Sequence, residues 1–555
     1  MTIETFEPQS TFGRIMKERL AKKRKNSTQT TTQTVQPANS RLDEILAKSE
    51  KTTVPEQKQI PKTKPITAPQ KPAKPKTPAP YVPDSNAADK FRGMHEFFVE
   101  NKLFLTDAYD IKFKKHKTHK VTSNGSIKAI RAKESYNSQI LLSLLTHVGY
   151  NERGTKHNNT MLSQGDPGLG KTILAEYCGQ FVFHETADQV ADSTIQCHPQ
   201  QTAETMVAHY DLAKLMQGKK EVHTSSWMKN KGKIIDEIQR LPDETIAIIL
   251  QTIDSGKTKY GDDVIRASEG AITATMNAPD GGSTPIVPAA NDRFQVSARY
   301  KTVNGNFVPA IIDQGMKNSQ PLSVPRECYI DTNTILTARK EIRQVTIDKD
   351  AIRKLVFYIS QIDGCDKAGD SLENKTKSNA QYRKPSEGLC VSCHYSKKPC
   401  AYFDNSVSMR ATEAILTYAK GLAWFRKKTE VQEEDIAAIL PYVLQHRAEI
   451  TPTAIEKKGV WENDRIAFIK DTFKESSKQF IKYQNSIPEF KQMLDDLDDP
   501  HSLVYSQNKL TKETAKRLEG YFDTVIQKMD DVAAFSYAGI LSFALEHFDK
   551  NGNTN

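Results

Sequence analysis

The stretch QGDPGLGKTIL, residues 164–174, decides the fold class of this chain. From Gly165 to Thr172 it obeys the spacing G-x-x-x-x-G-K-[ST], in which backbone N–H groups turn toward phosphates, the lysine reaches the β and γ oxygens and the hydroxyl binds Mg²⁺. The preceding NTMLSQ is short and strand-like, and apolar residues follow the loop at helical spacing. The loop therefore leads into a helix N-terminus, whose dipole attracts anions. We predict a phosphate-binding loop for a nucleotide at Gly165, Asp166, Pro167, Gly168, Leu169, Gly170, Lys171 and Thr172.

A second motif lies in KGKIIDEIQRLPDETIAIILQTIDSG, residues 231–256. Lys233 to Ile235 form a short buried strand that ends in two carboxylates. Asp236 is placed to hold Mg²⁺, and Glu237 is placed to orient or deprotonate the attacking water. After Pro242 a helical pattern resumes. The pair therefore predicts hydrolysis of the nucleotide and not binding alone.

Three further polar residues follow this motif. The stretch GAITATMNAP is a buried strand that ends at Asn277, whose amide could bind the attacking water or the γ-phosphate. In IVPAANDRFQVSARY, Arg293 either completes the nucleotide site of a neighbouring subunit, as an arginine finger, or forms a surface salt bridge. Arg410 lies in the first turn of a helix that begins near SMRA.

The order of these parts resembles that of AAA+ ATPases and, within them, the MoxR clade; MCM-type proteins are more distant relatives. The motifs are GDPGLGKT, IIDEI, Asn277 as sensor 1, DRF, and a lid that runs from SMRA to VLQHR. The resemblance covers roughly residues 130 to 450 and implies a parallel αβα sandwich, a helical lid, a ring that is usually a hexamer, and Arg410 as sensor 2. Sensor 1 reads NAP where the family usually has NP, which puts the local turn in doubt.

Composition limits the class of protein. The 555 residues exceed one core, and charged residues make up 26%. Mean hydropathy is −0.60, with no run of some 18 apolar residues, and the start lacks an apolar signal region. Seven cysteines argue against a secreted disulfide framework. We expect a soluble cytoplasmic protein without a membrane span.

The domain plan is an α/β core with helical additions. Residues 1–88 are expected to be a disordered Pro/Lys/Thr-rich tail that carries much of the net charge of +10, and the basic segment 89–130 is unassigned. The nucleotide-binding core spans 131–330, the lid 331–450 and a helical C-terminal region 451–555.

A cysteine-rich insertion interrupts the lid at residues 364–403. Cys365, Cys390, Cys393 and Cys400 are spaced C-x₂₄-C-x₂-C-x₆-C, a set that suits a tetrahedral thiolate site. Zn²⁺, a [4Fe–4S] cluster and unliganded thiols all remain open, and His394 could replace one cysteine. Cys178, Cys197 and Cys328 are expected to be core residues.

Three functions are compatible with this sequence. The first is a ring-forming ATPase that remodels or matures a protein substrate or adaptor, as the resemblance to MoxR proteins implies. The second is an MCM-like motor or loader on DNA, which the positive charge favours but no helix-turn-helix or aromatic basic stripe supports. The third is a metal-chelatase motor or a scaffold that does not hydrolyse ATP; the intact Glu237 argues against the scaffold.

Overall fold

The computed structural model describes residues 86–101, 110–123, 126–151, 159–277, 288–301, 324–379, 384–458, 464–498 and 512–552, with the isolated positions 305, 308–309 and 312. Most of the expected tail, residues 1–85, lies outside the described residues. The turn after Asn277, residues 278–287, also lies outside them, so the NAP departure stays a prediction.

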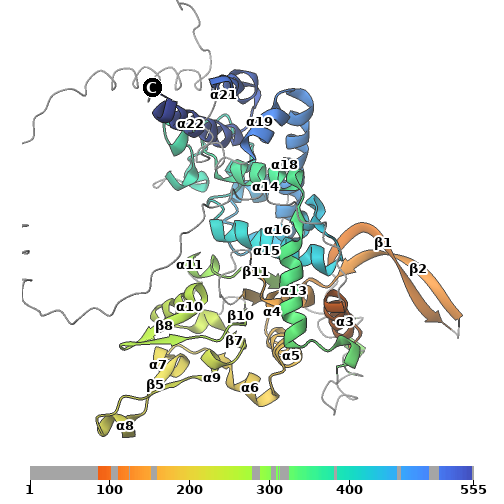
Figure 1. Ribbon diagram of the computed structural model, residues 1–555, viewed down its shortest axis with the longest axis vertical. Coiled ribbons are helices and arrows are strands. Elements are labelled where there is room, and N and C mark those ends of the chain that lie inside the picture. The colour runs from red at the N-terminus through yellow and green to blue at the C-terminus, as the bar shows by residue number, and fades with distance from the viewer. Residues whose placement is uncertain are drawn as a thin grey trace, which may run out of the picture. The chain divides into compact units, whose positions relative to one another are not determined.

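A parallel five-stranded sheet forms the centre of the nucleotide-binding core (Figure 1). The strand order is β11-β3-β10-β7-β4, and every neighbouring pair is parallel. The strands are β3 (Asn159–Gln164), β4 (Thr194–Gln196), β7 (Gly232–Asp236), β10 (Ala271–Met276) and β11 (Val296–Arg299). Because Met276 pairs with Gln164 and Ala274 with Ile235, β3, β7 and β10 end at the same edge, where the loops carry the predicted site.

Helices cover both faces of this sheet, which explains why β3, β7 and β10 are almost fully buried. One face packs its apolar side chains, including Met161, with α4 (Ser138–Val148) and α5 (Lys171–Phe183). The next residue, Leu162, points to the other face and belongs to the cluster with α10 (Asp243–Ser255) and α9 (Ser226–Lys229). The predicted αβα arrangement is therefore seen in the core.

Two hairpins and several short helices complete this core. The first hairpin is β5 (Ala208–Tyr210) and β6 (Val222–Thr224), with α8 (Leu212–Met216) between them; the second is β8 (Lys257–Tyr260) and β9 (Asp263–Arg266). The remaining elements are α6 (Ala187–Asp192), α7 (Ala203–Met206), η2 (Ile238–Arg240), α11 (Pro288–Asn291) and η4 (Arg326–Cys328).

Three of the four helices of the lid are capped at their first turns by acidic or hydroxyl side chains. Asp331, Asp348 and Ser408 accept hydrogen bonds from backbone N–H groups three residues ahead, which satisfies donors that have no partner inside the helix. The helices are α13 (Thr332–Gln344), α14 (Lys349–Asp363), α15 (Met409–Phe425) and α16 (Glu433–Leu444). Two short strands, β12 (Thr346–Ile347) between α13 and α14 and β13 (Glu430–Val431) between α15 and α16, pair with each other.

The segment that the sequence left unassigned is a helix followed by a hairpin. These are α3 (Asn86–Glu100), β1 (Ile111–Ser123) and β2 (Ser126–Tyr136). The helix begins at Asn86, inside the range assigned to the tail, because Phe91, Met94 and Phe98 are fully buried. The ring of Phe91 packs edge-on against Trp424 of the lid, at 5.6 Å between centroids.

The C-terminal region is helical in its described part, as the sequence predicted. It contains α17 (Pro452–Lys458), α18 (Arg465–Ser486), α19 (Phe490–Leu497), α21 (Lys512–Thr524), η9 (Ile526–Lys528) and α22 (Ala533–Gly552). Helices α18 and α22 pack against α14 of the lid (Figure 1). None of the helices in the described ranges has the length and apolar character that a membrane crossing needs.

Candidate nucleotide site

The phosphate-binding loop follows β3 directly and depends on its glycines. Gly168 and Gly170 have φ angles of 77° and 78°, in the left-handed region that favours glycine. Gly165 has no room for a side chain, because a Cβ there would lie 2.4 Å from the carbonyl oxygen of Tyr300. The loop therefore keeps its backbone close to β11 and feeds directly into α5, as the sequence predicted.

The side chain of Lys171 turns back over this loop. Its Nζ donates to the carbonyl oxygens of Gly165 and Asp166, at 2.8 and 2.7 Å, and to Oδ1 of Asn277 at 2.8 Å. Burial lowers the pKa of the lysine, while the carboxylates of Asp236, Asp166 and Glu237 act against that shift. The lysine is thus held where phosphate oxygens can become its acceptors.

Asp236 is the last residue of β7, and one of its carboxylate oxygens accepts hydrogen bonds from two hydroxyl groups. Its Oδ1 accepts from Thr172 at 2.8 Å and from Thr275 at 2.6 Å. A carboxylate and a hydroxyl beside the phosphate loop are the oxygen ligands that Mg²⁺ takes in such sites. The residues present therefore fit Mg²⁺-ATP: Lys171 and the loop would hold the phosphates, while Thr172 and Asp236 would hold the ion.

Glu237 has a left-handed backbone, with φ 57°. Its N–H donates to the hydroxyl of Thr275 at 2.9 Å, and its Oε1 accepts from Nδ2 of Asn277. Its Oε2 lies 2.7 Å from Nε of Arg240. A non-glycine residue in this conformation costs on the order of 1–3 kcal/mol, and such strain gathers at functional sites.

Sequence reasoning missed Thr275 and Arg240. Thr275 is two residues before Asn277 on β10, so it points to the same face of the strand, and that alternation was the available signal. Arg240 is three residues after Glu237 on the short turn η2 and had no motif to mark it. Both act on Glu237 or Asp236, so they position the predicted carboxylates.

The two predicted arginines lie together, away from this loop. Nε of Arg293 is 2.7 Å from Oδ2 of Asp254, and Nη2 of Arg410 is 3.3 Å from the same oxygen. Nη1 of Arg410 also lies 3.3 Å from Oδ2 of Asp292. Among the described residues, none of the hydrogen bonds and ion pairs of either arginine reaches the phosphate loop or Glu237.

The backbone of Arg293 lies at the opposite edge of the sheet from the phosphate loop. Its carbonyl oxygen accepts from the hydroxyl of Thr160 at 2.9 Å, and Thr160 is at the start of β3, whereas Gly165 follows its end. Five residues of extended strand span about 16 Å. The chain's own nucleotide loop is therefore beyond the reach of Arg293.

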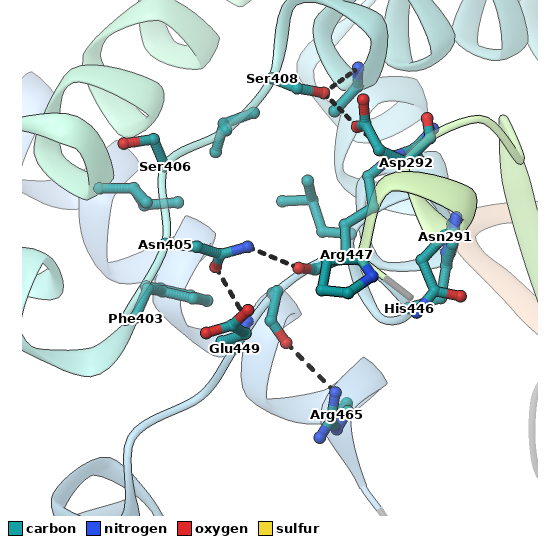
Figure 2. Close-up of a pocket in the computed structure, with 16 residues that line it drawn as sticks. Asn291, Asp292, Phe403, Asn405, Ser406, Ser408, His446, Arg447, Glu449 and Arg465 are labelled. Atoms are coloured by element: carbon teal, nitrogen blue, oxygen red, sulfur yellow. Dashed lines mark hydrogen bonds and ion pairs between the residues drawn. The ribbon is translucent and has the colours of Figure 1, made fainter. Parts of the chain in front are cut away.

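Lid and core meet beside these arginines, around a cavity of about 350 Å³ (Figure 2). Ser408, the N-cap of α15, donates to Asp292, and Nε of Arg447 lies 3.3 Å from the same carboxylate. Asn405 donates to the carbonyl of Arg447 at 2.7 Å and accepts from the N–H of Glu449 at 2.9 Å (Figure 2). Asp292 thus ties the start of the lid helix to the core.

A single buried histidine reinforces this junction. Nε2 of His446 is 2.8 Å from the carbonyl oxygen of Phe294. Burial, and then the neighbouring Arg447, lower the pKa of His446 well below its ordinary value, so the ring is neutral when folded. Arg293 and Arg410 therefore lie beside a junction that contains a pH-sensitive group, the ring of His446.

The four cysteines of the insertion approach one another in the structure. Cys365 and Cys400 are buried, and Cys390 and Cys393 are half-buried. Burial raises the pKa of the Cys400 thiol to about 12, and the other three cysteines add to that shift through their charges. The other cysteines, Cys178, Cys197 and Cys328, are buried in the body of the protein, as expected of core residues.

Comparisons with known proteins agree with this architecture. Residues 160–294 match the AAA domain of the dynein-related subfamily, and residues 400–466 match the AAA lid domain. The magnesium-chelatase subunit ChlI of Chlorella vulgaris is 24% identical over 231 residues, which are 40% of this chain and 53% of that protein. The chain thus spans about half the length of this curated relative.

Two solved structures are also similar. A protein of Cytophaga hutchinsonii, provisionally described as an ATPase, has a TM-score of 0.43 and 18% identity, over 70% of this chain and 96% of its own. An MCM homologue from Methanopyrus kandleri has a TM-score of 0.34 and 12% identity, over 56% of this chain and 55% of its own.

The phosphate loop, the carboxylate pair and the parallel sheet define a P-loop ATPase. The matched AAA domain at residues 160–294 and the matched AAA lid domain at residues 400–466 agree with this class.

Proposed function

We propose that this protein is a ring-forming AAA+ ATPase that uses ATP hydrolysis to remodel a protein partner. A ring is supported by the placement of Arg293 and Arg410, which lie beyond reach of the chain's own phosphate loop. A second copy that presents its loop to this face would gain both arginines, which stabilise charge on the transferred phosphoryl group. Closed rings form when such head-to-tail contacts repeat, and a hexamer is the expected size.

The proposal of a protein substrate is supported by exposed apolar side chains at the tip of the β5–β6 hairpin. Helix α8 lies at the outer end of this hairpin (Figure 1). Leu212 is 71% exposed, Leu215 46% and Met216 91%. Adjacent exposed apolar side chains favour contact with apolar segments of another protein, and methionine adapts to varied shapes.

The hairpin tip is also well placed to move with the nucleotide-binding core. Its base is tied to the second hairpin, since Tyr210 donates to the carbonyl of Tyr260 at 3.3 Å and Lys220 pairs with Asp263 at 2.9 Å. The second hairpin directly follows α10, whose Asp254 holds both arginines. Occupation of a nucleotide site is therefore linked through α10 to the apolar tip.

A second candidate, a motor on DNA, is favoured by the β1–β2 ribbon. Its strands pair antiparallel over most of Ile111–Tyr136, and its sequence is rich in lysine. A two-stranded ribbon fits the major groove, and basic segments neutralise phosphates. The third candidate, a metal-chelatase motor, is supported by the similarity to the Chlorella subunit.

The test compares ATP turnover with casein, which lacks a stable fold, and with single-stranded DNA. We expect casein to raise turnover several-fold in the wild type and to lose this effect in the double variant Leu212→Ser/Met216→Ser. Ile481→Ser, a matched change of an apolar residue that is 42% exposed on α18, should respond as the wild type does. Stimulation by DNA alone, unaffected by the tip variant, would favour the DNA motor instead.

A further inference from the structure

The insertion between α14 and α15 lacks an ordinary core. Its described residues, 364–379 and 384–403, form only short 3₁₀ turns and no α-helix or paired strand beyond two isolated bridges. The turns are η5 (Leu372–Asn374), η6 (Lys377–Asn379), η7 (Pro385–Glu387) and η8 (Pro399–Tyr402). A segment of this size buries too little apolar surface to fix such turns, and small units of this kind usually need a metal or a crosslink.

Four cysteines from separate parts of the insertion converge. Cys365 follows α14 directly, and its N–H donates to the carbonyl of Lys375 at 2.9 Å. Cys390 and Cys393 share a tight turn, in which the N–H of Cys393 donates to the carbonyl of Cys390 at 3.1 Å. Cys400 lies in η8 and is buried. The charges of the other three thiols act on Cys400, so the four cysteines lie near one another.

The turn between Cys390 and Cys393 is strained. Ser392 has a φ of 56°, in the left-handed region where a serine costs energy. Strained residues persist where the surrounding structure determines them, and they gather at ligand clamps. A C-x₂-C turn of this kind directs both thiols to one side, as ligand binding requires.

Positive side chains surround the thiols. Lys377 is 8% exposed, its Nζ donates to the carbonyl of Phe403 at 2.6 Å, and its charge acts on Cys400, Cys365 and Cys390. Lys367, whose Nζ donates to the carbonyl of Val391, also acts on Cys390. A buried lysine is costly unless negative charge lies close by; Asp363 supplies part of that charge, and thiolates bound to a metal would add to it.

The spacing of the sulfurs distinguishes a single ion from a cluster. Zinc binds thiolate sulfur at about 2.3 Å, which places four tetrahedral sulfurs about 3.8 Å apart. Among the described residues, Asp211, Glu221 and His223 bring three ligand atoms within 4.8 Å of one another, and no three of the four cysteines do so. A cubane cluster needs the wider spacing, because each sulfur binds a different iron.

We propose that Cys365, Cys390, Cys393 and Cys400 bind a [4Fe–4S] cluster that holds the turns of the insertion together. The insertion meets these helices through polar contacts at Asp530, to which His394 is bonded at 2.8 Å through Nε2, and whose carbonyl accepts from Nζ of Lys398 at 2.8 Å. The cluster would therefore order the turn that carries His394 and Lys398, and these two side chains make the contact with Asp530.

The test is the metal content of the full chain purified without oxygen. We expect about four iron atoms and four acid-labile sulfides per chain, together with a broad visible absorbance band. Cys393→Ser should lose most of the iron, the sulfide and the band. Cys178→Ser is the matched control, because its serine can keep the contact with Ser143 that lies at 3.2 Å, and it should retain all three.

The outcomes separate the alternatives. His394→Ala should keep its iron, since the histidine is assigned to Asp530 and not to the cluster. About one zinc per chain without sulfide would overturn the proposal, and so would full iron content in Cys393→Ser. The wild-type measurement does not depend on whether the variant folds, and wild-type protein without iron, sulfide or zinc would also contradict the proposal.

Discussion

The two edges of the central sheet differ in how complete they are. At the edge where β3, β7 and β10 end, Lys171 donates a hydrogen bond to Asn277. At the same edge, Asp236 accepts hydrogen bonds from Thr172 and Thr275. At the opposite edge, Arg293 and Arg410 are paired with acidic side chains and have no phosphate loop of their own chain within reach. One chain thus carries a nearly complete binding site and, separately, the groups that would complete a neighbour's.

In the proposed ring, the two halves of one catalytic centre are held by different physical means. The binding edge is fixed by backbone geometry, since left-handed glycines and the close approach to Tyr300 leave the loop few alternatives. The arginine edge is fixed by exchangeable ion pairs at Asp254 and Asp292, which partly exposed side chains can leave at little cost. The second edge is therefore suited to respond to a neighbour.

The largest effect is expected at the arginine edge. Arg293→Ala should lower ATP turnover by roughly 10³-fold, because an arginine finger stabilises charge that develops only in the transition state. ATP binding, measured by equilibrium titration with a fluorescent nucleotide analogue, should change little.

A mixing experiment then tests whether the two edges belong to different chains. Lys171→Ala and Arg293→Ala should each be inactive alone, but a mixture should regain part of the turnover, since each supplies the edge that the other lacks. A mixture of Lys171→Ala with Glu237→Gln is the control and should stay inactive, because both lesions lie at the same edge. If the first mixture stays inactive, the two edges do not complete one nucleotide site between two chains.

A somewhat smaller loss is expected from Glu237→Gln. Removal of the general base should reduce turnover by roughly 10²-fold while ATP remains bound, since Lys171 and Asp236 are untouched. Glu244→Gln changes an exposed carboxylate in the first turn of α10 and should leave turnover unchanged. Equal losses in both variants would refute the role of Glu237; single-turnover kinetics make the measurement.

Loosening the arginine pair should have a modest effect. Asp254→Asn removes the charge that Arg293 and Arg410 share, which is worth about 1 kcal/mol for a partly exposed pair, or roughly fivefold in rate. Asp262→Asn, at a fully exposed turn, is the control. If Asp254 positions the arginines, turnover falls and its dependence on protein concentration steepens; unchanged kinetics would show that the neighbour alone positions them.

The smallest effect concerns pH and the junction beside the arginines. His446 is neutral when folded, whereas in the unfolded chain it gains a proton below about pH 6.5. Its contribution to stability is therefore present above that pH and is lost on acidification. Relative to His446→Gln, the wild type should lose about 2 kcal/mol of unfolding free energy between pH 7 and pH 5.

Urea titrations at both pH values provide this measurement. Asp363, whose pKa burial raises to about 6, is present in both proteins, so its titration cancels in the difference. An equal slope of stability against pH in the two proteins would show that His446 is not buried in its neutral form.

Sequence and structure agree best where function depends on local spacing. The loop from Gly165 to Thr172 and the pair Asp236–Glu237 are contiguous motifs at the ends of buried strands, so their spacing fixes their geometry. Thr275 escaped notice because hydroxyl residues are common in strands, and its role depends on the parallel pairing of β10 with β7. The segment before residue 130 escaped because its helix is stabilised by distant lid residues such as Trp424.

The sequence by itself determined the ATPase core, the candidate Mg²⁺ ligands and the cysteines of the insertion, because each is a short pattern of fixed chemistry. Only the tertiary structure decided that Arg410 lies with Arg293 at Asp254, that Arg240 pairs with Glu237, and that His394 contacts Asp530. The reason is physical: these contacts join residues whose distance depends on how helices pack and on which edge of the sheet a loop occupies, and local sequence periodicity carries no information about either.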